Sequence, residues 1–118
     1  MTDALRTRIT VEQIIDAGEF IRTVSQRGRH AFMTDRLVRD AVIRNFEVIG
    51  EAAKRLPDEV RALSPGVPWK QVAGLRDWLI HGYDAVDYGR LWNVIEHDLD
   101  PLIEEARRLR ALPGMEGS

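Results

Sequence analysis

The sequence predicts an all-α protein built as an up-and-down bundle of four to five helices. Apolar residues recur at intervals of three and four residues in four separate segments, which is the pattern of helices that bury one face. Alternating runs of β-branched residues, which would indicate strands, are missing. Because the chain has 118 residues and shows no internal repeat, we expect a single domain over residues 1–118, with its core between about residues 10 and 110.

The first helix is predicted from Val11 to about Arg27. Thr10 is a suitable N-cap residue, and Gln13, three residues later, would complete a capping box. Gly28 is expected to end the helix. One stripe of this helix contains Val11, Ile14, Ile15, Gly18, Ile21 and Ser25.

The second helix is predicted from about Asp35 to Leu56, with Thr34 as its cap and Pro57 as its stop. Gly50, in the middle of this helix, would cost roughly 1 kcal/mol relative to alanine. We therefore expect Gly50 to let a neighbouring helix approach closely rather than to mark a break. The apolar stripe contains Leu37, Val38, Ala41, Val42, Phe46, Ile49, Ala53 and Leu56.

A loop separates the second helix from the third. Residues 58–63 could form a short helical turn, and residues 64–68 have the proline and glycine content of a loop. Pro68 suits the first turn of a third helix, which is predicted from Trp69 to about His81 or Tyr83. Gly74 is a candidate interruption of this helix.

The last predicted helix begins after Asp87 and reaches about Arg110. Asp87 is a suitable cap for its first turn. Pro101 removes one backbone donor and is expected to kink or divide the helix.

Charge is unevenly distributed along a chain whose net charge is −2 at pH 7. A dedicated nucleic-acid binder is usually basic overall, so the sum counts mildly against that class. Six arginines gather between Arg22 and Arg44, and seven acidic residues gather between Asp84 and Glu105. These segments are either two solvated helix faces or a positive surface for a phosphate backbone and an acidic surface for a partner or a second copy of the chain.

The composition also limits the class of protein. The chain has no cysteine, which excludes disulfides and thiolate metal sites and suits a reducing cytosol. The first ten residues carry charges and no apolar run, so no signal peptide is expected. No segment approaches the roughly 18 apolar residues of a membrane span. We expect a soluble, cytoplasmic protein.

The predicted third helix carries the side chains best suited to chemistry. Asp77 and His81 lie four residues apart, so the carboxylate can hold one nitrogen of the imidazole and raise its pKa. Tyr83 aligns with Arg76, seven residues earlier, if the helix continues that far. The opposite side of the helix, which should face the core, contains Leu75, Trp78, Leu79 and Gly82.

Arg76 and His81 are five residues apart and diverge by about 140° on an ideal helix. One helix therefore cannot easily aim both at one phosphate, whereas two copies related by a two-fold axis could. A histidine with a pKa near neutrality can move a proton, and a guanidinium can bind a phosphate and offset its developing charge. The pair would suffice for attack of an RNA 2′-hydroxyl on the adjacent phosphate without a metal or cofactor. The alternative is a surface histidine paired with Asp77.

Two blocks of the sequence resemble the HepT-like proteins of the HEPN superfamily. The first block is residues 68–83, PWKQVAGLRDWLIHGY, followed by Val86-Asp87 and Leu91-Trp92, and the second is the upstream segment 44–54, RNFEVIGEAAK. The family signature is Arg, a polar residue, three more residues, His, any residue and Tyr. In this chain the signature corresponds to Arg76, Asp77, His81 and Tyr83. The resemblance extends over about residues 14–109.

The resemblance implies an all-helical, two-fold symmetric homodimer in which signature residues of both protomers line a shared cleft. Members act as endoribonucleases on RNA and serve as toxins, which implies a toxin–antitoxin pair of type II or a type VII-like kind. Arg76 and His81 would be catalytic, with Asp77 and Tyr83 in support. The implied antitoxin is a minimal nucleotidyltransferase of the MNT type, which can transfer AMP to the signature tyrosine, here Tyr83. An alternative is a non-catalytic helical module that such a transferase binds and modifies.

Asp77 departs from the family pattern, in which asparagine often follows the arginine. Its negative charge lies in a site that must accept phosphate, although it could hold His81 protonated. Arg36, Arg39 and Arg44 could steer RNA or form surface ion pairs. Glu51 could be a partly buried polar contact of a dimer and is assigned no role.

The remaining histidines and tryptophans have no expected part in chemistry. His30 and His97 are expected at the surface, and no metal-ligand spacing emerges from the three histidines. Trp69, Trp78 and Trp92 are expected in the core or in a dimer interface.

Overall fold

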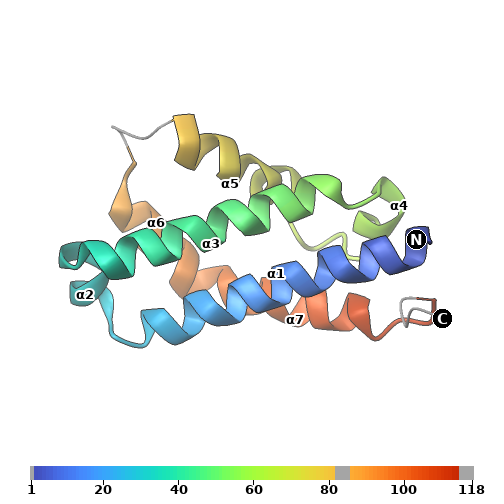
Figure 1. The fold of residues 1–118 in the computed structure, drawn as a ribbon, viewed down its shortest axis with the longest axis horizontal. Coiled ribbons are helices and arrows are strands. Elements are labelled where there is room, and N and C mark those ends of the chain that lie inside the picture. Colours follow the sequence, from blue (N-terminus) through green and yellow to red (C-terminus); the bar gives the residue numbers. More distant parts are fainter. Residues whose placement is uncertain (1, 82–85, 115–118) are drawn as a thin grey trace.

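The computed structural model describes residues 2–81 and 86–114, and these residues form seven α-helices without a strand. Four rods, α1, α3, α5 and the α6–α7 pair, run up and down beside one another, while the short helices α2 and α4 lie at opposite ends (Figure 1). The predicted all-α, up-and-down bundle is therefore confirmed. The helices are α1 (Asp3–Ser25), α2 (Arg29–Thr34), α3 (Arg36–Arg55), α4 (Asp58–Arg61), α5 (Trp69–His81), α6 (Tyr88–His97) and α7 (Leu99–Arg110).

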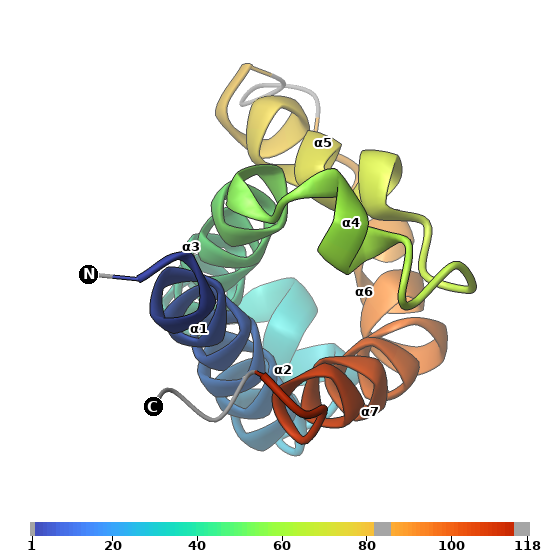
Figure 2. The same ribbon diagram turned by 90° about the vertical axis from the view of Figure 1, so that its right-hand side faces the viewer.

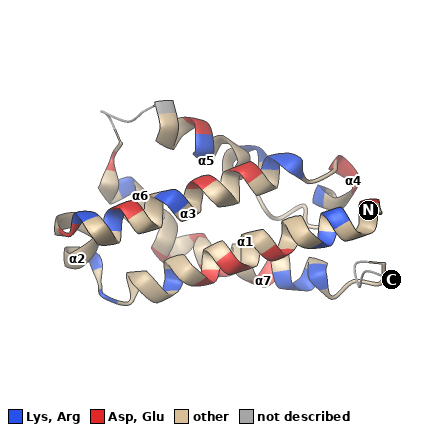
Figure 3. Cartoon of the chain, viewed as in Figure 1, with Lys and Arg blue, Asp and Glu red and all other residues tan. Residues whose placement is uncertain are grey.

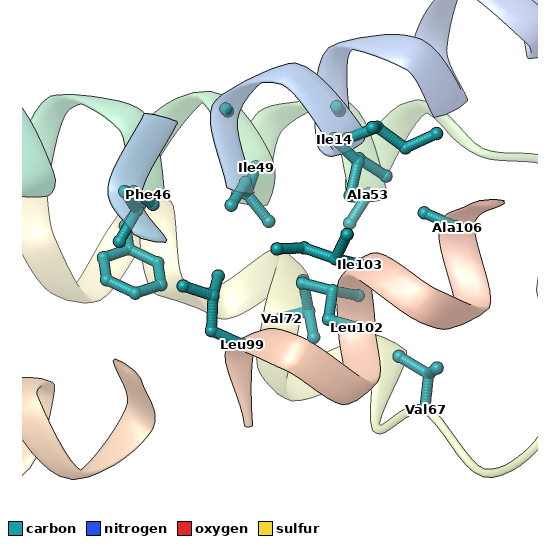
Figure 4. Packing of buried hydrophobic residues seen from close by; sticks show 14 of the residues in the cluster. Ile14, Phe46, Ile49, Ala53, Val67, Val72, Leu99, Leu102, Ile103 and Ala106 are labelled. Carbon is teal, nitrogen blue, oxygen red and sulfur yellow. The ribbon is translucent and has the colours of Figure 1, made fainter. Parts of the chain in front are cut away.

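The helices are arranged around one axis, as the view along the bundle shows (Figure 2), and buried apolar residues fill the centre. Helix α3 packs against α1 on one side and α5 on the other, and α7 packs against α1. Phe46 and Ile49 of α3 are almost fully buried, as are Leu99 and Ile103 of α7 (Figure 4). Ile14 of α1 reaches the same cluster. The apolar stripes of the sequence thus meet in one core.

Helix α1 begins earlier than predicted. The hydroxyl of Thr2 accepts a hydrogen bond from the backbone N–H of Leu5 at 3.1 Å, so Thr2 is the N-cap. The hydroxyl of Thr10 instead donates to the carbonyl of Arg6 at 2.9 Å, inside the helix. The predicted capping box of Thr10 and Gln13 was wrong because residues 3–9 contain no helix breaker and simply extend the helix.

The join between α1 and α3 also differs from the prediction. Helix α1 ends at Ser25, earlier than the predicted end at about Arg27, and Gly28, with a φ of 95°, is instead the N-cap of the additional helix α2. Asp35, rather than Thr34, caps α3, because its carboxylate accepts from the N–H of Leu37 at 2.9 Å. The side chain of Leu37 is 82% exposed, so its assignment to the apolar stripe was wrong. In this first turn the neighbouring Val38 takes the place that faces the core.

The loop before α5 is tied to α7 by a buried serine. The hydroxyl of Ser64 donates to Glu105 at 2.8 Å and accepts from Arg108 at 2.9 Å. The indole N–H of Trp69 donates to the Ser64 carbonyl at 3.0 Å. Glu105 also accepts from Nε of Arg108 at 2.9 Å, and the bonds from the Ser64 hydroxyl first and Arg108 second hold the pKa of Glu105 below its ordinary value. The loop that leads into α5 is therefore attached to α7.

The fourth predicted helix is divided, as expected, into α6 and α7. Asp87 caps α6 by accepting from the N–H of Arg90 at 3.1 Å. The break falls at Asp98, so Pro101 lies in the first turn of α7, where its missing donor leaves no helical bond unmade. Helix α5, in contrast, continues through Gly74. No described helix has the length and apolar character needed to cross a membrane.

Candidate active site on helix α5

Helix α5 touches the middle of α3 directly, and Gly50 is the reason. A β-carbon built at Gly50 would lie 2.8 Å from the backbone nitrogen of Arg76 and 3.2 Å from the carbonyl oxygen of Val72. Such distances leave no room for any side chain at this position. The expectation that Gly50 allows close helix approach is confirmed, and the backbone that it admits belongs to Arg76.

The guanidinium of Arg76 is held by carboxylates on two helices. Its Nε lies 2.8 Å from an oxygen of Glu51, the residue after Gly50 on α3. Its Nη1 lies 3.3 Å from Asp77, the next residue on α5. The side chain of Arg76 is 38% exposed, so the guanidinium is restrained yet open to solvent. This combination suits a group that must meet a ligand in a set orientation.

Glu51 belongs to a line of polar side chains that crosses three helices. Its other carboxylate oxygen lies 3.8 Å from Nη1 of Arg55. Nη2 of Arg55 donates to the side-chain oxygen of Gln13 on α1 at 2.7 Å. Gln13, predicted to cap a helix, instead ends this line, because α1 begins well before it and its side chain faces α3.

These side chains line an open groove of about 400 Å³ beside α5. Three arginines and two glutamates line the groove, and the carboxylate of Asp77, 3.3 Å from Arg76, offsets the third positive charge. Arg44, one of the predicted RNA-steering residues, is among them and forms an ion pair of 3.5 Å with Glu47. Basic and acidic segments alternate along α3, and a basic and an acidic segment adjoin on α5 (Figure 3). The lining residues are Gln13, Arg44, Glu47, Val48, Glu51, Arg55, Arg76 and Ile80.

The other two predicted RNA-steering arginines lie outside this groove. Arg36 is exposed and pairs with Asp40 at 3.2 Å. Arg39 donates to the carbonyl of Met33 at 2.9 Å, and its guanidinium lies 4.5 Å from the ring centroid of Tyr88. The structure therefore brings Arg44, but neither Arg36 nor Arg39, together with Arg76.

The remaining signature residues lie at the end of α5. His81 is its last residue, and the structure describes only its backbone, while Tyr83 lies outside the described residues. Because α5 is unbroken from Arg76 to His81, the two positions lie about 140° apart around the helix axis. Asp77 is mostly exposed beside Arg76.

The predicted inner face of α5 is confirmed where the structure describes it. Leu79 is buried, and Leu75 and Trp78 pack against the core. Gly82, the fourth predicted member, lies outside the described residues. The aromatic ring of Trp78 also carries the guanidinium of Arg90, 5.6 Å from its centroid.

The other histidines and tryptophans lie where the sequence predicted. His30 and His97 are exposed, and Trp69 and Trp92 are buried. Across residues 2–81 and 86–114, no group of three histidine or acidic side chains could hold a metal ion.

Sequence reasoning missed the contact between Glu51 and Arg76. The two residues are far apart in the chain, and no helical spacing links them. The signal available was indirect: a charged residue directly follows the glycine expected to admit a second helix.

Comparison with known proteins points to one family. The family model described as Ribonuclease HepT-like matches residues 14–109. Over 95 residues the chain is 36% identical to "Putative RNase MJ1380" of Methanocaldococcus jannaschii, covering 80% of this chain and 84% of that one. Over 79 residues it is 40% identical to "Probable ribonuclease HepT" of Thermococcus cleftensis, covering 67% and 72%.

This chain is also similar to part of a longer protein. "Gamma-glutamylcyclotransferase and putative RNase MJ0434" of M. jannaschii is 38% identical over 103 residues, or 86% of this chain, which spans only 46% of that protein. No solved structure matches the chain.

Proposed function

Because this chain belongs to the ribonuclease HepT-like family, we propose that it is a metal-independent endoribonuclease that acts through Arg76 and His81. His81 takes the proton of an RNA 2′-hydroxyl as that oxygen attacks the adjacent phosphorus. The bond from phosphorus to the 5′-oxygen breaks, leaving a 2′,3′-cyclic phosphate, and the 5′-oxygen gains a proton from water. Arg76 offsets the charge that grows on the phosphate oxygens. Asp77 orients His81, and Tyr83 positions the RNA.

One observation carries this proposal: the guanidinium of Arg76 is held by carboxylates in an open groove that two further arginines also line. The ion pair with Glu51 restrains Nε at 2.8 Å. A guanidinium restrained at Nε can still present its outer nitrogens to a phosphate. Arg44 and Arg55, which line the same groove, would attract the neighbouring phosphates of the strand.

The nuclease proposal is tested by RNA cleavage in EDTA with purified protein. We expect His81→Ala and Arg76→Ala to abolish cleavage while the far-ultraviolet circular dichroism and thermal unfolding remain those of the parent. Arg36→Ala is the matched control, since Arg36 is an exposed arginine outside the groove. Equal cleavage by the parent and by His81→Ala would assign the activity to a contaminant and refute the proposal.

The groove as an RNA path is tested by the salt dependence of binding. Each lost phosphate contact lowers the slope of log affinity against log salt by about 0.7 for a single strand. In a His81→Ala background, which leaves the RNA uncut, we expect this loss for Arg44→Ala but not for Arg36→Ala. Fluorescence anisotropy of a labelled RNA over a salt series measures both slopes. An equal loss for the two variants would mean that the groove is not the path.

We further propose that the protein is a homodimer with Arg76 and His81 of different protomers meeting in one cleft. The divergence of about 140° along an unbroken α5 supports this arrangement. A heterodimer of Arg76→Ala and His81→Ala protomers, isolated with two tags, would then keep one intact site of two. We expect about half of the parent activity per dimer. A heterodimer without activity would show that each site uses both residues of one protomer.

The family resemblance also leads us to propose a toxin role with a nucleotidyltransferase antitoxin of the MNT type. AMP on Tyr83 would place bulk and negative charge near Arg76 and exclude a phosphate. Expression alone should arrest growth, and co-expression with the transferase should relieve the arrest and add the mass of AMP to Tyr83. A Tyr83→Phe protein should escape relief. Stable co-purification with the transferase but no cleavage by the unmodified protein would favour the alternative, a non-catalytic partner module.

A further inference from the structure

Arg76 needs an outside restraint if it is to meet a phosphate in a set orientation. An arginine side chain has several rotatable bonds and, on an exposed helix, samples many orientations. In the structure, its Nε lies 2.8 Å from the carboxylate of Glu51. Because that carboxylate comes from another helix, the contact restrains the side chain in a way that the backbone of Arg76 itself cannot.

The restraint depends on how close α3 and α5 lie. Gly50 lets the backbone of Arg76 lie directly against α3. A β-carbon at position 50 would lie 2.8 Å from the backbone nitrogen of Arg76. Glu51 is the next residue along α3. One residue therefore sets the backbone position of Arg76 and its neighbour sets the direction of the side chain.

The carboxylate of Glu51 also contacts a second arginine of the groove. Its second oxygen is 3.8 Å from Arg55, so one carboxylate is shared between two guanidinium groups. The side chains of Glu51 and Arg76 are 42% and 38% exposed. Ion pairs this exposed contribute little to folding stability, so a structural role does not account for the arrangement.

We propose that Glu51 is the positioning residue of this site, holding Arg76 in the orientation that stabilises the scissile phosphate. The inference rests on the proposed ribonuclease function and extends it to a residue outside the signature. Glu51 acts through Arg76 and need not contact RNA itself.

The test compares Glu51→Gln with Glu12→Gln, the same neutralisation outside the groove. Glu12 on α1 pairs with Arg8 at 3.2 Å, and its side chain is 40% exposed, close to the 42% of Glu51, which makes it a matched control. Misplacement of a catalytic group costs up to about 100-fold, so we expect Glu51→Gln to lower kcat by about 10- to 100-fold with a much smaller change in KM. Glu12→Gln should leave kcat near that of the parent.

Two further measurements separate positioning from a general structural effect. The Nε–H signal of Arg76 in a nitrogen–proton correlation spectrum, assigned with Arg76→Lys, should exchange faster with water in Glu51→Gln and stay unchanged in Glu12→Gln. In an Arg76→Lys background, Glu51→Gln should change kcat by less than about 2-fold, because its effect passes through the guanidinium.

The outcomes separate this inference from the function on which it rests. If Arg76→Ala cleaves RNA like the parent, the proposed function fails and the inference with it. If Arg76→Ala is inactive but Glu51→Gln matches Glu12→Gln in kcat and in the Nε–H exchange, the inference alone is overturned. If the effects of Glu51→Gln and Arg76→Lys on log kcat were fully additive, the inference would be overturned as well.

Discussion

Replacing Gly50 with alanine tests the packing on which the site depends. The added β-carbon would lie 2.8 Å from the backbone nitrogen of Arg76 and 3.1 Å from its β-carbon, so α3 and α5 must separate by several tenths of an ångström. Overpacking of this kind lowers the free energy of unfolding by about 1–3 kcal/mol. Alanine regains roughly 1 kcal/mol through its higher helix propensity. We expect a net loss of about 0–2 kcal/mol in the free energy of unfolding.

The matched control is Gly74→Ala on α5. A β-carbon at Gly74 meets nothing within 4 Å, so only the propensity gain remains. Gly74→Ala should be about 1 kcal/mol more stable than the parent, and the two variants should differ by about 1–3 kcal/mol. Guanidinium chloride unfolding followed by circular dichroism measures both values. If Gly50→Ala proved as stable as Gly74→Ala, the close contact between α3 and α5 would not exist in solution.

Two further predictions test the core and one hydrogen-bonded carboxylate. Leu37→Ala should change the free energy of unfolding by no more than about 0.5 kcal/mol, whereas the same replacement at buried Leu99 should lower it by about 2–5 kcal/mol, as denaturant unfolding would show. A large loss at Leu37 would mean that its side chain is covered in solution. Glu105 has a pKa below its ordinary value of 4.5, so its bonds to Ser64 and Arg108 stabilise the fold above that pH and are lost as the pH falls through the lowered pKa. Glu105→Gln should therefore have a lower Tm than the parent at pH 7, with a smaller fall of Tm on acidification; calorimetry showing parallel pH curves would contradict this.

The elements that the sequence predicted well are those marked by local chemistry. Asp87 caps α6 because a carboxylate can accept from the free N–H groups of a first turn, and Pro101 lies at a helix start because it lacks a donor. Gly50 was interpretable because a glycine in mid-helix needs a compensating contact. Leu37 was misassigned because periodicity does not show where the core ends, and residues 3–9 were missed because they carry little of the apolar pattern.

The candidate site was predictable only in part for a related reason. Arg76 was singled out by a motif within one helix. Its partner Glu51 lies on another helix, and Arg55 and Gln13 extend the contact to a third. Such pairings depend on the rotation of each helix about its axis, which the packing of the whole bundle sets. The local pattern around Gln13 favoured a capping role that the longer α1 made impossible.

Gly50 and Glu51 connect the packing of this bundle to its chemistry in separable ways. Gly50 acts through distance, since any side chain there displaces the backbone of Arg76, so its replacement should alter stability and site geometry together. Glu51 acts through an exposed ion pair, which contributes little to the free energy of unfolding, so its replacement should alter the site while leaving the fold intact. Replacement of Gly50 should therefore change stability and activity together, whereas replacement of the adjacent Glu51 should change activity alone. That contrast is what a site held by helix packing, rather than by a loop, should produce.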